Sequence, residues 1–68
     1  MKPQTDYIAN AILRDLRYGQ STVDAVAMRC GYKASQVQEV MTRLEKLRKV
    51  NSKTINNGKF TVYELRQA

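Results

Sequence analysis

The residue types in this chain of 68 residues leave little room for catalytic or metal chemistry. The chain has no histidine and a single cysteine, Cys30. Catalytic triads, haem ligation and structural zinc sites rely on histidine or on clustered cysteines, and an internal disulfide needs a second thiol. We therefore expect no enzyme, no metal and no cofactor, with Cys30 as a small buried apolar residue in a reducing compartment.

The cations are the residues that could do binding chemistry, because they are concentrated in one part of the chain. The formal net charge of +6 lies entirely in residues 29–59, and the segments before and after are neutral. A stripe of lysine and arginine attracts polyanions, of which nucleic acid is the natural example. A basic surface that meets only solvent is the alternative that charge alone leaves open.

Within that block, residues 34–49 combine an apolar stripe with a polar face. The apolar residues recur at helical spacing, which predicts a helix that buries Val37, Val40, Met41, Leu44 and Leu47. The opposite side carries hydrogen-bonding and charged side chains, namely Ser35, Gln38, Glu39, Thr42 and Lys46, flanked by Gln36, Arg43 and Lys49. Short polar side chains together with cations are typical of surfaces that read base edges.

Two supporting helices are predicted ahead of this one. The first covers residues 5–18, with Thr5 as its cap and Gly19 as its stop. Its inward residues are Ile8, Ala9, Ile12, Leu13 and Leu16. The second covers residues 22–30, with Val23, Val26, Ala27 and Cys30 facing inward.

Capping signals mark the starts of the second and third helices. Ser21 and Asp24 have the spacing of a capping box. Ser35 and Gln38 have the same spacing, so the third helix is expected to begin at residue 34 or 35. Gly31 breaks the second helix, so a short turn is expected between the two.

The end of the chain is predicted to be a β-hairpin over residues 51–65. Asn57 and Gly58 form the pair that a type I′ turn prefers, because both of its central residues take positive φ. A two-residue loop pairs Ile55 with Phe60, and a longer loop would change that register.

The spacing of Ala27, Gly31 and Val37 is that of a helix-turn-helix, with a small residue where the helices cross and a glycine in the turn. The chain resembles the winged helix-turn-helix family of bacterial and phage DNA-binding regulators, including MarR-like repressors. The similarity is closest over residues 37–50, which look like the recognition helix. One departure is that the family usually ends this helix with glycine, where this chain has Arg48.

The resemblance implies a mainly α fold with a small β-hairpin: a single winged helix-turn-helix domain over residues 1–68, with three helices and a two- or three-stranded wing. It implies a sequence-specific double-stranded DNA-binding protein, a small transcriptional regulator of the cytoplasm and nucleoid. The helix at residues 34–49 would enter the major groove, and the wing would lie on the backbone or minor groove.

Base-reading candidates follow from the same resemblance: Ser35, Gln36, Gln38, Glu39, Thr42 and Arg43. Gln38 would pair with adenine, and Arg43 with guanine or phosphate. Glu39 would pair with a cytosine amino group, or would instead repel wrong sites. Candidates for backbone contact are Arg29, Lys33, Lys46, Lys49, Lys53, Asn56, Asn57 and Lys59.

Several alternatives stay open. The domain could be a protein-interaction module, an excisionase-like architectural DNA-binding protein, or a binder of structured RNA, although no aromatic stacking platform is visible. A homodimer could form through Ile55, Phe60 and Val62 or through Tyr7 and Tyr18, unless these residues complete the monomer's own core.

No apolar run exceeds four residues, so neither a membrane span nor a signal peptide is expected.

Overall fold

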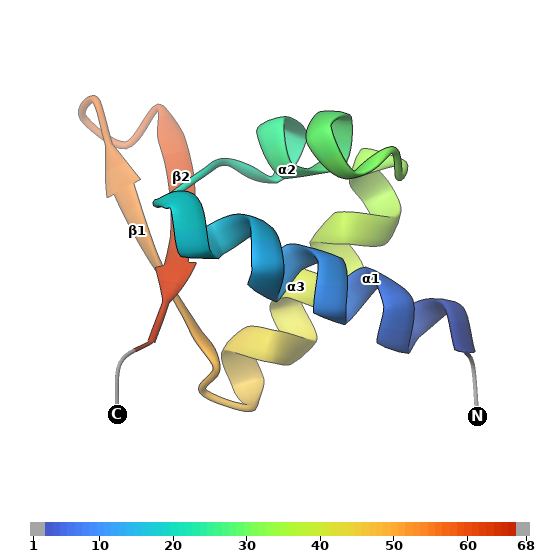
Figure 1. Ribbon diagram of the computed structural model, residues 1–68. Coiled ribbons are helices and arrows are strands. Elements are labelled where there is room, and N and C mark those ends of the chain that lie inside the picture. The colour runs from blue at the N-terminus through green and yellow to red at the C-terminus, as the bar shows by residue number, and fades with distance from the viewer. Residues whose placement is uncertain (1–2, 67–68) are drawn as a thin grey trace.

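Three α-helices and one β-hairpin form residues 3–66, the part of the chain that the computed structural model describes, with residues 3–5 described by backbone alone (Figure 1). Helix α1 spans Pro3–Asp15 and continues as one 3₁₀ turn, η1, over Leu16–Tyr18. The remaining elements are α2 (Val23–Cys30), α3 (Ala34–Lys46), β1 (Val50–Ile55) and β2 (Phe60–Leu65). This order confirms the predicted mainly α, winged helix-turn-helix architecture.

Helix α1 begins two residues earlier than predicted. Thr5 lies inside the helix rather than at its cap, and Pro3 takes the first position, where its missing N–H costs nothing. Gly19 ends η1 as expected, with φ of 132° and its N–H donating to the Leu16 carbonyl at 3.1 Å.

Helix α2 is capped by Thr22, and the expected Ser21–Asp24 box is wrong. The Thr22 hydroxyl accepts a hydrogen bond from the Ala25 amide at 3.2 Å. Ser21 is committed elsewhere, because its backbone pairs with Tyr63 through hydrogen bonds of 3.0 and 2.8 Å. This isolated bridge joins the segment before α2 to the two-stranded hairpin.

The start of α3 also differs from the predicted capping box. The Lys33 amide donates to the Gln36 side-chain oxygen at 3.3 Å, so Gln36 closes the first turn in place of Ser35 and Gln38. Gly31 forms the preceding turn in the left-handed conformation, at φ of 79°, as expected for the glycine of a helix-turn-helix.

Helix α3 ends at Lys46, three residues earlier than predicted. Arg48 adopts the left-handed conformation at φ of 61°, which is the conformation that a glycine in its place would take. The Lys49 amide donates to the Leu44 carbonyl at 2.9 Å and the Arg48 amide to the Glu45 carbonyl at 3.0 Å. These two bonds form a Schellman motif, so the helix ends in the usual way with an arginine at the glycine position.

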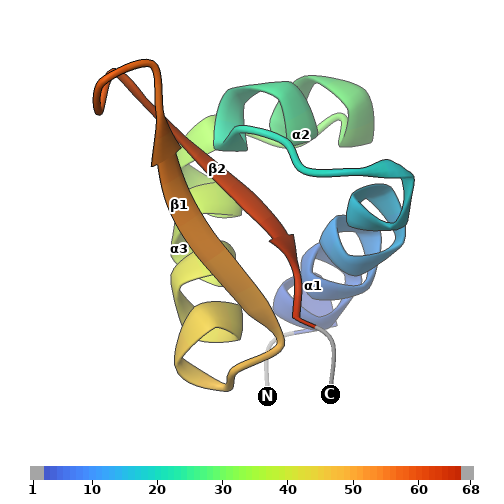
Figure 2. The same cartoon turned by 90° about the vertical axis from the view of Figure 1, so that its left-hand side faces the viewer.

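The hairpin has the predicted register, from Val50 opposite Leu65 to Ile55 opposite Phe60. Asn57 and Gly58 have φ of 58° and 84°, and the Lys59 amide donates to the Asn56 carbonyl at 3.2 Å. This is the predicted type I′ turn. The hairpin tip projects past the helices (Figure 2).

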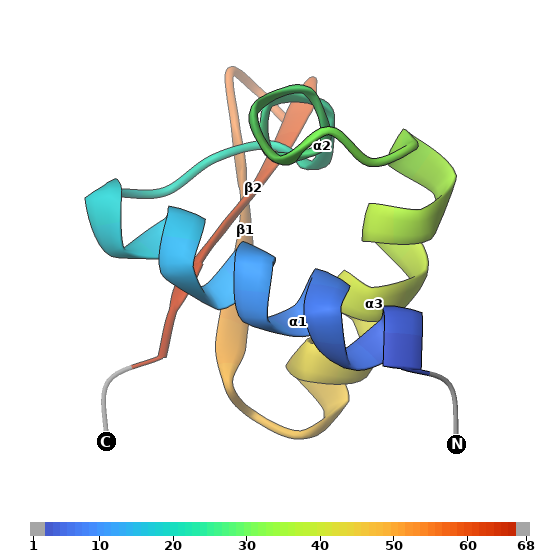
Figure 3. The same cartoon turned by 45° about the vertical axis from the view of Figure 1, so that its right-hand side comes forward.

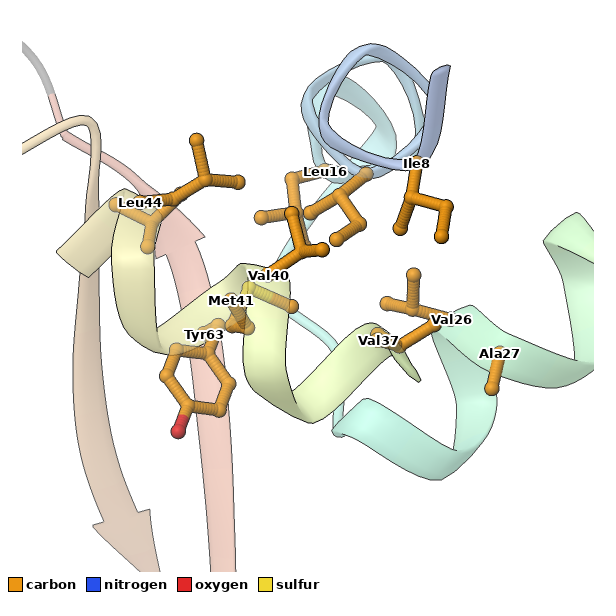
Figure 4. Packing of buried hydrophobic residues seen from close by; sticks show 11 residues of the cluster. Ile8, Leu16, Val26, Ala27, Val37, Val40, Met41, Leu44 and Tyr63 are labelled. Carbon is orange, nitrogen blue, oxygen red and sulfur yellow. The ribbon is translucent and has the colours of Figure 1, made fainter. Parts of the chain in front are cut away.

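The core lies where α1 and α2 pack on α3 and one face of the hairpin closes the side (Figure 3). Its buried residues are Ile8, Ile12, Leu16, Val26, Ala27, Val37, Val40, Met41, Leu44, Val50 and Tyr63 (Figure 4). Leu47, predicted to be buried, is 66% exposed because α3 has already ended. Cys30 packs against the core as expected, and partial burial raises the pKa of its thiol.

The apolar residues considered for a homodimer divide into two groups. On the outer face of the hairpin, Val62 is buried and Ile55 is half-buried, although Phe60 remains half exposed. Tyr7 and Tyr18 are exposed.

Within residues 3–66, no helix is long and apolar enough to cross a membrane.

Candidate nucleic-acid interface

Helix α3 presents its polar face to solvent because its apolar stripe holds the other side against the core. Its 13 residues span about 20 Å at 1.5 Å per residue. The major groove of B-DNA is about 12 Å wide and admits one helix of this kind. Five of the six base-reading candidates are exposed on this face, namely Ser35, Gln38, Glu39, Thr42 and Arg43, whereas Gln36 is half-buried and closes the first turn.

Gln38 and Thr42, one turn apart on α3, are hydrogen-bonded to each other, and Gln38 is also bonded to the hairpin. The Gln38 side-chain nitrogen, Nε2, lies 3.3 Å from both the Thr42 hydroxyl and the Tyr63 hydroxyl. The Thr42 hydroxyl in turn donates to the Gln38 backbone carbonyl at 2.9 Å. The polar face is therefore partly ordered before any partner arrives.

Glu39 and Arg43 form a loose ion pair on the same face. Their closest atoms are 3.5 Å apart, and the side chains of Arg43 and Glu39 are 58% and 70% exposed. An exposed pair of this spacing contributes about 0.3–0.5 kcal/mol, so either side chain can leave it for another partner at little cost.

The hairpin supplies cations and amides on the surface beside α3. Asn56, Asn57 and Lys59 are exposed at its tip. Lys53 lies in the middle of β1 and pairs with Glu64 across the sheet at 3.7 Å. At the base of the hairpin, the Ser52 hydroxyl donates to Glu45 of α3 at 2.6 Å, which ties the strand to the end of the helix.

A concave surface connects the hairpin to the N-terminal parts of α2 and α3. Its volume is about 490 Å³, and it is open to solvent. It brings together two base-reading candidates of α3, Ser35 and Gln38, with Lys59 from the hairpin tip. The rest of its lining is Thr22, Val23, Asp24, Ala34, Phe60, Thr61 and Tyr63.

The other candidate lysines lie outside this concave surface. Lys33 is exposed in the turn before α3, and Lys46 and Lys49 are exposed at the opposite end of the helix, beside the hairpin base. Within the described part of the chain, none of Lys33, Lys46, Lys49 and Lys59 forms an ion pair.

Arg29, a predicted backbone-contact residue, forms hydrogen bonds within the protein. Its guanidinium donates to both carboxylate oxygens of Asp15, at 2.9 and 2.7 Å, and also to the Ser21 hydroxyl. The hydrogen bonds from Arg29 lower the pKa of the Asp15 carboxyl, against the opposing effect of its partial burial. Arg29 therefore joins the end of α1 to α2.

Tyr63 belongs to this surface although it is not among the site residues predicted from the sequence. It lies opposite Ser52 in the hairpin. The alternation of β2, which puts Tyr63 on the face that packs against the helices, is the signal that could have drawn attention to it.

No protein-family model and no curated protein matches this sequence. Among solved structures, an apo mutant of Lactococcus lactis ZitR superposes with a TM-score of 0.85 at 18% identity, over 94% of this chain and 49% of that chain. The adhesin competence repressor AdcR of Streptococcus pyogenes has a TM-score of 0.83 at 18% identity, over 88% of this chain and 46% of that chain.

A ZitR mutant solved in complex with DNA has a TM-score of 0.79, also at 18% identity, over 88% of this chain and 42% of that chain. The chain thus spans about half the length, or somewhat less, of the solved chains that it resembles. These likenesses confirm the winged helix-turn-helix fold that the sequence predicted.

Proposed function

We propose that this domain binds double-stranded DNA in a sequence-specific manner and acts in transcriptional regulation. The observation that carries the proposal is the concave surface on which the polar face of α3 meets Lys59 of the hairpin tip. A structural neighbour with the same fold was solved in complex with DNA, which supports DNA as the partner.

Helix α3 would lie in the major groove, with the hairpin on the backbone or minor groove. Ser35, Gln38, Glu39, Thr42 and Arg43 point outward and are the proposed base contacts. The weak Glu39–Arg43 pair supports this role, because a bidentate base contact discriminates by about 1–3 kcal/mol and exceeds the cost of opening the pair.

Phosphate contacts are proposed for the backbone-contact candidates among the lysines that have no ion-pair partner in the described part of the chain: Lys33, Lys46, Lys49 and Lys59. Asn56 and Asn57 of the tip are proposed to reach sugar or phosphate. Lys53 and Arg29 contribute less to the proposal, since each has a carboxylate partner within the chain.

The test measures binding to random-sequence duplex DNA by fluorescence anisotropy across a salt series. Two matched double variants are compared with the wild type: Lys46→Ala/Lys59→Ala at the proposed interface, and Arg14→Ala/Arg17→Ala on α1 and η1. Each phosphate contact contributes about 0.9 to the slope of log K against log salt, so the first variant should lose about 2 from the slope. The second should keep the wild-type slope.

Two results would contradict the proposal. Equal losses in both variants would mean that the binding surface is not α3 and the hairpin. No binding by the wild type at low salt would remove DNA as the partner and favour the alternative, a winged helix that binds another protein.

A further inference from the structure

Tyr63 connects the hydrophobic core to the polar face of α3. The residue is 7% exposed and belongs to the core cluster. In Figure 4 its hydroxyl points away from the other labelled core residues. The hydroxyl oxygen lies 3.3 Å from Nε2 of Gln38. A residue of the hairpin thus contacts a proposed base-reading residue of the helix, 25 positions away in the chain.

The orientation of the Gln38 amide follows from counting protons. The Thr42 hydroxyl has one proton, which it donates to the Gln38 backbone carbonyl at 2.9 Å. The Thr42 oxygen can therefore only accept a hydrogen bond from the Gln38 side chain. The Gln38 atom that faces it is the donor Nε2 and not the acceptor Oε1. The same nitrogen donates its second proton to the Tyr63 hydroxyl.

Both amide protons of Gln38 are therefore used within the protein. Its Oε1 atom receives no hydrogen bond from the described part of the chain. The usual pairing of glutamine with adenine is bidentate and needs one free N–H donor as well as the oxygen acceptor. In this arrangement Gln38 offers the acceptor alone.

We propose that Tyr63 is a positioning residue that makes Gln38 read a hydrogen-bond donor on the base edge. The donors in the major groove are the amino groups of adenine and cytosine, whereas guanine and thymine present acceptors there. Gln38 would thus accept adenine and cytosine alike and reject guanine and thymine. This inference rests on the proposed function and refines the expected Gln38–adenine pair.

The variant that isolates this role is Tyr63→Phe. It keeps the buried ring and removes the hydroxyl, which frees one N–H of Gln38 to donate to N7 of adenine. The matched control is Tyr18→Phe, which removes a hydroxyl from a tyrosine that is 91% exposed on η1. Thermal melts of both variants check that the fold is kept.

The experiment begins with selection of binding sites from a random duplex library. The position whose base preference disappears in Gln38→Ala is the one that Gln38 reads. Anisotropy is then measured on four duplexes that differ only at that position. For the wild type and Tyr18→Phe we expect adenine and cytosine to agree within about threefold, with guanine and thymine weaker by about fivefold or more. For Tyr63→Phe we expect adenine to exceed cytosine by about fivefold or more.

A second measurement needs no DNA. In a ¹⁵N-correlated NMR spectrum, the side-chain amide signal of Gln38 should shift in Tyr63→Phe and not in Tyr18→Phe. An unshifted signal would overturn the hydrogen bond on which the inference depends.

The outcomes of the binding experiment separate the inference from the proposed function. The inference is overturned, with DNA binding intact, by a strong wild-type preference for adenine over cytosine, by an unchanged ratio in Tyr63→Phe, or by no position that responds to Gln38→Ala. Failure of all four proteins to bind DNA would instead overturn the proposed function, and the inference with it.

Discussion

The N-terminal region, residues 3–31, and the C-terminal region, residues 32–66, differ in the geometry of their ion pairs. In the first, Arg29 holds Asp15 through two short hydrogen bonds of 2.9 and 2.7 Å. In the second, the Glu39–Arg43 and Lys53–Glu64 pairs are longer, at 3.5 and 3.7 Å, and exposed. Short bidentate pairs order the groups that they join, whereas long exposed pairs contribute little. The Asp15–Arg29 pair therefore serves the fold, whereas the charges of the Glu39–Arg43 and Lys53–Glu64 pairs stay available to a partner.

The helix ends show a second difference between the two regions. Gly19 and Gly31 follow η1 and α2 with positive φ, which glycine adopts without strain. At the end of α3, Arg48 takes φ of 61°, which costs a residue with a side chain about 1–2 kcal/mol. The turns of the N-terminal region are relaxed, and the junction between α3 and the hairpin is strained.

The largest effect should come from removing core volume in the N-terminal region. Ile12 is fully buried, and Ile12→Ala should destabilise the domain by about 2–5 kcal/mol. A domain of this size has about 3–10 kcal/mol of stability in total, so this loss is a large fraction of it. The control, Leu47→Ala, changes an exposed residue of the C-terminal region and should stay within about 0.5 kcal/mol of the wild type. Urea unfolding followed by circular dichroism measures both, and a large loss in Leu47→Ala would contradict the observed end of α3.

A smaller gain is expected from relaxing the strained junction. Arg48→Gly should stabilise the domain by about 0.5–1 kcal/mol, because the relief of left-handed strain exceeds the added entropy of the unfolded chain. Lys49→Gly, one residue on and without a positive φ, should destabilise it instead. Urea midpoints that move in the same direction for both variants would show that Arg48 is not strained.

The smallest effect concerns the ion pair of the N-terminal region. Because the pKa of Asp15 is lowered in the folded protein, its contribution to stability is complete above its ordinary value of 3.8. That contribution is lost as pH falls through the lower folded-state pKa. Asp15→Asn should therefore be less stable than the wild type at neutral pH, and the difference should vanish in acid. Thermal melts from pH 7 downward measure it, with Asp6→Asn, an exposed change on α1, as the control.

The same variant sharpens the comparison between the two regions. If the Asp15–Arg29 pair serves only the fold, Asp15→Asn leaves the salt dependence of DNA binding unchanged. A steeper salt dependence of DNA binding would show that the released Arg29 joins the binding surface. The two regions would then no longer differ in how their charges are used.

Local residue patterns were enough to predict the elements and the hairpin register. The turn chemistry of Asn57 and Gly58 defines a two-residue loop, and a loop of fixed length leaves one register between its strands. The 3.6-residue period likewise predicted the buried face of α3, apart from Leu47.

The helix ends were less predictable, because several polar residues compete for each cap. Ser21 was expected to cap α2, but it pairs with Tyr63, and Thr22 takes its place. Gln36 likewise closes the start of α3 in place of Ser35. At α2, the competitor that caps the helix depends on a backbone partner far away in the chain.

The sequence alone determined which residues form helices and strands, where the net charge lies, and which face of α3 is polar. These properties follow from side-chain periodicity, turn chemistry and composition, all of which act over a few neighbouring residues. The tertiary structure alone decided which polar side chains are free. Arg29 finds Asp15 across 14 positions and Gln38 finds Tyr63 across 25, and such partners meet only when packing brings separate elements together.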